Sequence, residues 1–401
     1  MDLIETAKEA LSEGYVCDHC LGRQFGQLLS GLTNEERGRA VRLALAMAAD
    51  AGRTDVNGAN FAGIRFRKRK TTAKRGPCTV CGDLFMELPA FVAKAKKKLE
   101  GVEFKTFVAG TKLSADLAAR EERLWERMGI EWCEPLKAEV NREFGKLLEK
   151  EMGKVADLDS PDVEVVLNLE ESAVELRIAS LYVHGKYRKL ARGIPQTKWD
   201  MYPVTVEDII AKPFMKATKG TGHALHGSGR EDIDARCLDG RPFVLEIEGP
   251  RRRTLDLKSM EREVNKSRKV QVSGLRQSSR QEVREVKAEK RDKTYRVVAV
   301  FSKPVTGLEK LKKLQGMINQ QTPTRVMHRR ANLMRKRKVK AIAWKRLSPR
   351  TVEFTVRAES GLYVKELITG DSGRTRPSAA ELLGNEAKIK SLDVIKIWDG
   401  R

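Results

Sequence analysis

Two Cys-x-x-Cys pairs constrain the first part of the chain more than any other feature. The pairs are Cys17/Cys20 and Cys78/Cys81, and 57 residues separate them. Each such turn aims two thiolates at one point, and two turns together complete a tetrahedral site for a zinc ion. A redox motif or unrelated free thiols are the alternatives, although a redox pair needs no second pair. We therefore expect a structural zinc site with a small subdomain inserted between the two pairs.

Charge is the second constraint. The 401 residues include 78 lysines and arginines against 55 aspartates and glutamates, a formal net charge of +23. An excess of this size predicts a polyanionic partner, and nucleic acid is the first candidate. The chain has no run of 18 apolar residues, and its N-terminus lacks a basic segment followed by an apolar one. We expect no membrane span and no export, hence a cytoplasmic location in which thiols stay reduced and can bind zinc.

The pattern along the chain predicts three domains. Residues 1–90 form a zinc-binding unit, 91–200 a mixed helix and strand block, and 201–401 the domain that carries the candidate site. The first unit contains the basic run Arg65-Phe-Arg-Lys-Arg-Lys70, whose five cations and one aromatic ring suit phosphates and a stacked base. A solvated basic loop explains this run equally well.

Apolar spacing predicts the elements of the second block. Helices are expected over about 114–128 and 136–152, followed by a hairpin of strands over 163–169 and 174–181. The block ends in the segment 182–199, where tyrosines and cations interleave, which suits a surface that stacks on exposed bases. Buried aromatic packing is the alternative there, above all for Trp199.

The last domain alternates strands with charged segments. Residues 295–301, 351–358 and 392–397 are expected to be strands, and 308–318 to be an amphipathic helix. The segment 255–292 is strongly charged and has few large apolar residues, so we expect it to face solvent.

A glycine turn leads into the most unusual part of this domain. Gly227 and Gly229 flank a serine, and Arg230, Glu231, Asp232 and Asp234 follow at once. The next segment, 241–249, alternates apolar and acidic residues like a strand. The order predicts a polar site on a rigid sheet. A surface turn is the plainer interpretation, and two aspartates that share a metal ion or a proton are another.

The turn resembles a known signature. Gly229-Arg-Glu-Asp232 is similar to the Gly-Arg-x-Asp motif of pseudouridine synthases, and the run from Ser228 to Phe243 resembles the archaeal and eukaryotic family that acts on the TΨC arm of tRNA. The zinc pairs, a THUMP-like block, the loop Thr322-Pro-Thr-Arg325 and the segment Tyr363–Ser378 follow that family in order. The resemblance implies a multidomain α+β fold, with a zinc-binding and THUMP-like RNA-binding region before a catalytic domain built on an antiparallel sheet.

The resemblance also implies an activity and its residues. The reaction isomerises uridines 54 and 55 of tRNA to pseudouridine: the bond from ribose to nitrogen 1 breaks, the base turns, and carbon 5 rejoins the ribose. An ionised carboxylate must act near the sugar, and the family match gives this catalytic role to Asp232. A cation beside it would lower its pKa. The implied substrate-binding residues are Arg230, Tyr295, Val364, Lys365 and Leu392, and the expected RNA-binding residues are Arg67, Lys68, Arg188, Arg325, His328 and Arg329.

Two other functions remain open at this point. A zinc-containing tRNA-binding protein without activity predicts the same charge and cysteines, but it gives no reason for Asp232, Tyr295 and Lys365 to match together. A methyltransferase or thiolation enzyme with a THUMP-like module needs a glycine-rich cofactor loop after a strand, and none is visible. The expected protein is a monomer that binds tRNA, holds structural zinc and uses no catalytic cofactor.

Overall fold

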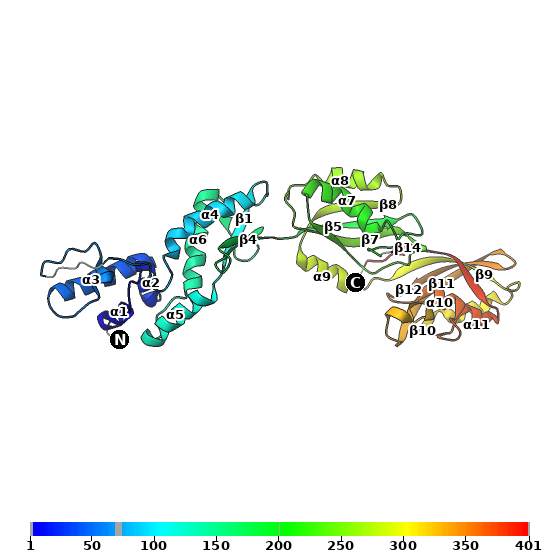
Figure 1. The fold of residues 1–401 in the computed structure, drawn as a ribbon. Coiled ribbons are helices and arrows are strands. Elements are labelled where there is room, and N and C mark those ends of the chain that lie inside the picture. Colours follow the sequence, from blue (N-terminus) through cyan, green and yellow to red (C-terminus); the bar gives the residue numbers. More distant parts are fainter. Residues whose placement is uncertain (1–2, 69–73, 200, 400–401) are drawn as a thin grey trace. The chain divides into compact units, whose positions relative to one another are not determined.

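The computed structural model describes residues 3–68, 74–199 and 201–399. The chain forms two compact units, Met1–Ala179 and Ser180–Arg401, drawn from blue to green-cyan and from green to red in Figure 1. Within the described ranges, none of the helices combines the length and the apolar character needed to cross a membrane.

The first unit begins with short helices around the cysteine pairs. Its helix α3 starts at a capping box in which Thr33 and Glu36 satisfy each other's backbone amides. Two glycines let α2 and α3 touch: a Cβ on Gly38 would lie 1.9 Å from the carbonyl oxygen of Asp18, and one on Gly22 would lie 1.7 Å from that of Asn34. The elements of this part are α1 (Leu3–Ala10), α2 (Asp18–Gly22), η1 (Arg23–Phe25), α3 (Asn34–Asp50) and η2 (Gly58–Phe61).

The rest of the first unit is a four-stranded sheet with helices. The strand order is β2-β1-β3-β4, in which β1 runs parallel to β2 and β3, and β4 runs antiparallel to β3. The predicted helices and hairpin are confirmed. One apolar core runs from α1 to β4, so the cysteine segments and the sheet share it. The elements are α4 (Leu84–Leu99), β1 (Thr106–Lys112), α5 (Ala115–Met128), α6 (Leu136–Met152), β2 (Val155–Ala156), β3 (Val163–Asn168) and β4 (Ala173–Ile178).

The second unit is built on a ten-stranded sheet with the order β13-β10-β11-β12-β9-β14-β7-β5-β8, and β6 adds to β7. All pairings are antiparallel except that of β14 with β7, which covers three residue pairs, from Leu392/Ala235 to Val394/Cys237. The predicted α+β class with an antiparallel catalytic sheet is confirmed. The strands are β5 (Leu181–Lys189), β6 (Gly222–Gly227), β7 (Ala235–Glu248), β8 (Val270–Ser278), β9 (Lys293–Phe301), β10 (Gly316–Gln321), β11 (Met334–Ser348), β12 (Thr351–Ala358), β13 (Thr375–Arg376) and β14 (Ala387–Ile397).

Helices cover separate regions of this sheet. One apolar core joins α7 and α8 to the strands around β5 and β7, and another joins α10 and α11 to the strands around β9 and β12. The helices are α7 (Val206–Thr218), α8 (Leu257–Asn265), α9 (Arg280–Ala288), η3 (Leu308–Leu314), η4 (Thr324–Arg329), α10 (Val364–Thr369) and α11 (Ala379–Leu383).

Two expectations from the sequence are wrong. The segment 255–292 folds into α8, β8 and α9, because its few apolar residues are spaced to face the core: Val264, Val270 and Val272 are buried. The segment 308–318 is a 3-10 helix followed by the start of β10, not one amphipathic helix.

The boundary between the two compact units differs from the predicted domain boundaries. The two compact units divide at Ala179/Ser180, and β5 pairs with β7 and β8 in the second unit, although the sequence placed its residues in the RNA-binding block. The division into 1–90, 91–200 and 201–401 stays a proposal about separate domains.

Candidate active site and metal centre

A cavity of about 650 Å³ lies in the second unit, where the glycine turn meets β9, η4, α10 and β14. The turn and the loop after it occupy the connection from β6 to β7, so two paired strands of the sheet fix its two ends. The sequence-predicted residues that line the cavity are Arg230, Asp232, Tyr295, Arg325, Val364, Lys365 and Leu392.

Asp232 is the acid in the cavity that two cations from other elements contact. Its Oδ1 accepts a hydrogen bond from Nη1 of Arg325 at 3.2 Å, and its Oδ2 lies 3.3 Å from Nζ of Lys365. Burial disfavours the ionised carboxyl, but Arg325 and Lys365 outweigh burial, and the pKa of Asp232 is lowered from its ordinary value. The carboxylate is therefore held ionised in a partly desolvated position.

Arg325 reaches this acid from η4 and is itself anchored. Its Nε donates to Oε1 of Glu366 at 2.7 Å, and only 6% of the Glu366 side chain is exposed. The structure places Arg325 between two carboxylates, and its predicted contact with the RNA backbone stays a prediction. Glu366 was missed, because a glutamate that follows a lysine in a charged chain is typical of a solvent-facing position.

Lys365 contacts two acids. Its Nζ lies 2.7 Å and 2.8 Å from the carboxylate oxygens of Asp234, whose side chain is 66% exposed, and 3.3 Å from Asp232. The Lys365 ammonium thus bridges the two aspartates, at the position where a metal ion shared by them would lie. The two acids also differ in environment, since Asp232 is the more buried and Arg325 holds it as well.

One part of the cavity wall is apolar. Tyr295 in β9 pairs with Val356 in β12 and Val394 in β14, which fixes its ring in the wall. Burial raises the pKa of Tyr295 to about 12, so its hydroxyl keeps its proton at neutral pH. Val364, the first residue of α10, and Leu392 are both buried beside it. The flat ring face of a base fits such a wall, with the carboxylate at the edge of the wall.

The remaining RNA-binding candidates whose side chains the structure describes do not line this cavity. Arg188 is exposed on β5, and His328 is exposed in η4. In the first unit, the amides of Arg67 and Lys68 donate to Oδ1 of Asp50 at 3.1 Å and 2.9 Å. The side chain of Arg329 lies outside the described part, as do Arg69 and Lys70.

Glu231, in the same loop as Asp232, is held by buried polar residues on the neighbouring strands. Glu231 lies 3.0 Å from Nε of Arg241, and the hydroxyl of Tyr187 donates to its Oε2 at 2.9 Å. The sequence suggested that Tyr187 stacks on exposed bases, but it is fully buried, because the alternation along β5 points it into the core. Trp199, for which burial was expected, lines the cavity and is partly exposed.

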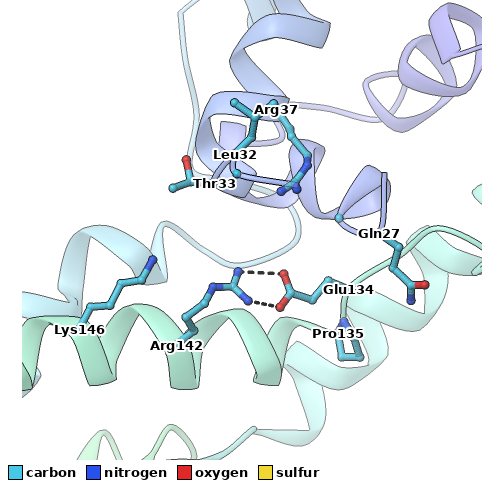
Figure 2. Close-up of a pocket in the computed structure, with 10 residues that line it drawn as sticks. Gln27, Leu32, Thr33, Arg37, Glu134, Pro135, Arg142 and Lys146 are labelled. Carbon is cyan, nitrogen blue, oxygen red and sulfur yellow. Dashed lines mark hydrogen bonds and ion pairs between the residues drawn. The ribbon is translucent and has the colours of Figure 1, made fainter. Parts of the chain in front are cut away.

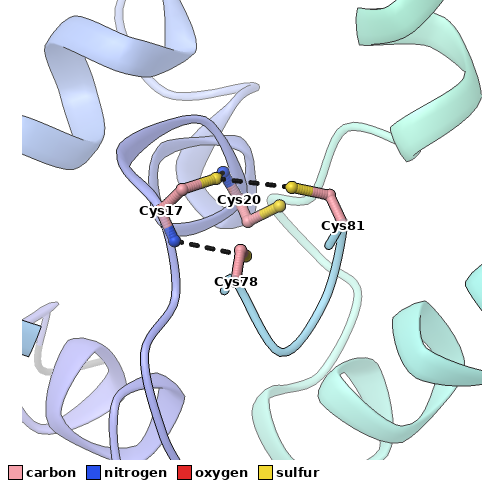
Figure 3. Close-up of side chains that lie close together, drawn as sticks. All are labelled: Cys17, Cys20, Cys78 and Cys81. Atoms are coloured by element: carbon pink, nitrogen blue, oxygen red, sulfur yellow. Dashed lines mark hydrogen bonds between the residues drawn. The ribbon is translucent and has the colours of Figure 1, made fainter. Parts of the chain in front are cut away.

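The four cysteines of the two pairs meet in the first unit (Figure 3). Their sulfur atoms all lie within 4.8 Å of one another, and Cys17 and Cys81 are 3.6 Å apart. A zinc ion with four sulfurs at about 2.3 Å separates neighbouring sulfurs by roughly 3.8 Å, so this set fits tetrahedral zinc. The amides of Cys17 and Cys20 donate to the sulfurs of Cys78 and Cys17, as expected for thiolate acceptors.

Arg23, a buried cation next to the cysteines, is independent evidence for a negatively charged metal site. It follows α2, which holds Cys20, and it is fully buried. Its Nη1 donates to Glu121 at 2.9 Å, while Nε and Nη2 have no partner among the described residues. Four thiolates around a zinc ion carry a net charge of −2, and an adjacent buried guanidinium offsets part of it. The residues present therefore fit the predicted metal.

A second cavity, of about 550 Å³, lies between the α2–α3 connection and α6 in the first unit (Figure 2). Arg142 lies across from Arg37 and donates Nη2 to Oε2 of Glu134 at 2.9 Å. Arg37 donates to the carbonyls of Leu28 and Leu29. The cations of this cavity are thus largely engaged by the protein itself.

Comparison with known proteins identifies the chain's relatives. The family model "Pus10, C-terminal" matches residues 182–398, and "Pus10 THUMP domain, archaeal" matches residues 91–168. The chain is 42% identical to the tRNA pseudouridine synthase Pus10 of Methanothrix thermoacetophila, over 99% of this chain and 94% of that protein. It is 37% identical to the protein of the same name from Pyrococcus furiosus, over 99% and 98%.

A solved structure is also similar, at a low level. The match to a Cbf5-Nop10-Gar1 complex has a TM-score of 0.33 and 18% identity, and covers 53% of this chain and 48% of that one. The two family models and the full-length relatives confirm the resemblance found in the sequence. On their strength, this chain belongs to the Pus10 family.

Proposed function

We propose that this protein isomerises uridines 54 and 55 in the TΨC arm of tRNA to pseudouridine, with Asp232 as the reacting carboxylate. The observation that carries the proposal is the setting of Asp232, which two cations keep ionised at the edge of a partly apolar cavity. Full-length relatives named tRNA pseudouridine synthase support the substrate and the reaction.

The residues divide the chemistry between them. Asp232 attacks the ribose at carbon 1′ or removes a proton from carbon 2′, and either step releases nitrogen 1 of the base. The base turns and carbon 5 bonds to carbon 1′, while the bond from Asp232 to carbon 1′ breaks or the proton returns to carbon 2′. Carbon 5 then loses a proton and nitrogen 1 gains one, so the product is an isomer. Tyr295, Val364 and Leu392 hold the base by contact while it turns. The steps need no electron acceptor and no activated group, so we propose that no catalytic cofactor takes part.

Charge and zinc serve binding and structure in this proposal. The uridine must leave its stack, which costs a few kcal/mol, and phosphate contacts of a chain with net charge +23 offset that cost. We propose Arg67, Lys68, Arg188, His328 and Arg329 for such contacts. Cys17, Cys20, Cys78 and Cys81 would hold a zinc ion that links the two segments of the first unit. The protein would act in the cytoplasm as a monomer.

The test is a single-turnover assay on unmodified tRNA transcript. Wild type is compared with Asp232→Asn and Asp234→Asn, pseudouridine is mapped by carbodiimide primer extension, and tRNA binding is measured in parallel. We expect Asp232→Asn to bind tRNA and form no product, while Asp234→Asn stays active. Wild type that binds tRNA but forms no pseudouridine would instead indicate a tRNA-binding protein without activity.

A further inference from the structure

The loop that carries Asp232 is held through its backbone carbonyls by the connection between β5 and α7. Nζ of Lys189 donates to the carbonyl oxygen of Asp232 at 3.1 Å and to that of Ile233 at 2.9 Å. The amide of Gly193 donates to the Ile233 carbonyl as well, at 3.0 Å. The peptide units on the C-terminal side of the reacting acid are thereby fixed from one direction.

The two ends of the loop are held by the same connection. Nε2 of Gln196 donates to the carbonyl oxygen of Gly229 at 3.0 Å, and Nη1 of Arg192 donates to that of Asp234 at 2.7 Å. Four donors within residues 189–196, three on side chains and one on the backbone, thus bind carbonyl oxygens of the loop between Gly229 and Asp234.

Lys189 is the unusual member of this set. It has no exposed surface, whereas lysines are almost never fully buried without a paired charge. Its ammonium donates to two carbonyl oxygens, and burial lowers its pKa. It does not line the cavity, so it does not touch the substrate. Burying a cation costs free energy of desolvation. Because this cation binds two consecutive carbonyls, its evident effect is to fix that stretch of backbone.

We propose that Lys189 is a positioning residue of the reaction, which holds the backbone at Asp232 so that its carboxylate stays between Arg325 and Lys365. This inference rests on the proposed function and adds a residue that acts through the loop. Since backbone displacements of about 1 Å can cost 10²-fold in rate, loss of this anchor is expected to affect the chemical step more than tRNA binding.

The experiment compares two identical substitutions on one strand. Lys189→Met removes the buried donor, and Lys186→Met changes an exposed lysine of β5 whose side chain has no role in the site. We expect the single-turnover rate of Lys189→Met to fall by about tenfold or more, with tRNA affinity within about twofold of wild type. Lys186→Met is expected to react like wild type.

A pH profile separates positioning from general loss of stability. Asp232 faces Arg325 on η4, Lys365 on α10, Tyr295 on β9 and Asp234 on its own loop. If the loop loosens, the two cations act on Asp232 less effectively, and the acid limb of the rate profile moves to higher pH. Lys189→Gln keeps an N–H donor and is expected to recover part of the rate.

A second variant tests the same loop if Lys189→Met does not fold. Arg192 is partly exposed, and Arg192→Gln removes its contacts to the carbonyls of Asp234 and Leu392 and to the carboxylate of Asp393. We expect a rate loss of about threefold and an acid limb shifted in the same direction. Folded variants at both positions that react at the wild-type rate would contradict the inference alone. A wild type that binds tRNA without reacting would contradict the proposed function and this inference together.

Discussion

At the scale of single residues, the site depends on a balance at Asp232. Burial raises the pKa of this carboxyl, and Arg325 and Lys365 lower it by more. The net shift stabilises the folded state above the unfolded pKa of about 3.9, and that contribution is lost as the pH falls through the lower folded-state pKa.

Arg325→Gln tests this balance. The variant leaves burial opposed mainly by Lys365, so the pKa of Asp232 rises and the acid limb of the single-turnover rate, measured from about pH 4 to about pH 8, moves to higher pH. It also leaves Glu366 buried without its guanidinium, which is expected to cost about 2 kcal/mol in urea unfolding. Lys365→Met is the comparison: it should shift the acid limb in the same direction without the stability loss at Glu366. An unchanged acid limb in both variants would contradict the inference that Arg325 and Lys365 lower the pKa of Asp232 against the effect of burial.

The sequence could predict the cavity residues but not their contacts. Asp232, Tyr295 and Lys365 were found through family motifs, and all three line one cavity. Glu366 and Lys189 carry no motif, and each lies against a residue distant in the chain, so only the folded structure reveals their partners. Tyr187 was misassigned because a tyrosine among lysines and arginines looks like a surface residue, whereas strand alternation buries it.

At the scale of elements, close approach of helices shapes the metal-binding part. A Cβ on Gly38 of α3 would lie 1.9 Å from the carbonyl oxygen of Asp18, the residue after the first cysteine ligand candidate. The helix periodicity of α3 is visible in the sequence, but nothing in it shows which helical glycine touches a neighbouring backbone. The strand β8 was missed for a similar reason, since its two buried valines, Val270 and Val272, are too weak a pattern in a charged segment.

Gly38→Ala is expected to separate α2 from α3. The clash is with backbone, so it cannot be relieved by a side-chain rotation, and we expect the variant to lose about 3 kcal/mol of stability and part of its zinc content. Gly145→Ala in α6 is the matched control, because its Cβ would make an ordinary contact at 3.5 Å and alanine favours the helix by about 1 kcal/mol. Urea unfolding and metal analysis of the purified variants measure both effects. Equal stability of the two variants would contradict the packing argument.

At the scale of the whole molecule, the metal-binding cysteines and the Asp232 cavity lie in two units with separate apolar cores. The four cysteines belong to the core of the first unit, and the Asp232 cavity belongs to the second. Charge, cysteine spacing and motif order allowed the sequence to predict a zinc-binding part followed by a catalytic part. The boundary at residue 179 could not be read from them, because β5 follows the first unit without a linker of distinct composition.

Metal removal is expected to affect the units unequally. Since structural zinc contributes directly to folding, a strong chelator should lower the unfolding temperature of the first unit by about 10 °C or more, while the transition of the second unit stays unchanged. Differential scanning calorimetry with and without chelator measures this, and re-addition of zinc should restore the first transition. A chelator that lowers both transitions equally would contradict separate cores.

The position of β14 has a consequence for synthesis of the protein. Among the described strands of the large sheet, β14 comes last in the chain, yet it lies in the middle, between β9 and β7. During translation the two half-sheets can therefore form, but no strand pairing joins them until β14 leaves the ribosome and inserts between them. Leu392 lines the cavity together with Asp232 and comes into place only with β14, so the cavity wall is completed after both half-sheets.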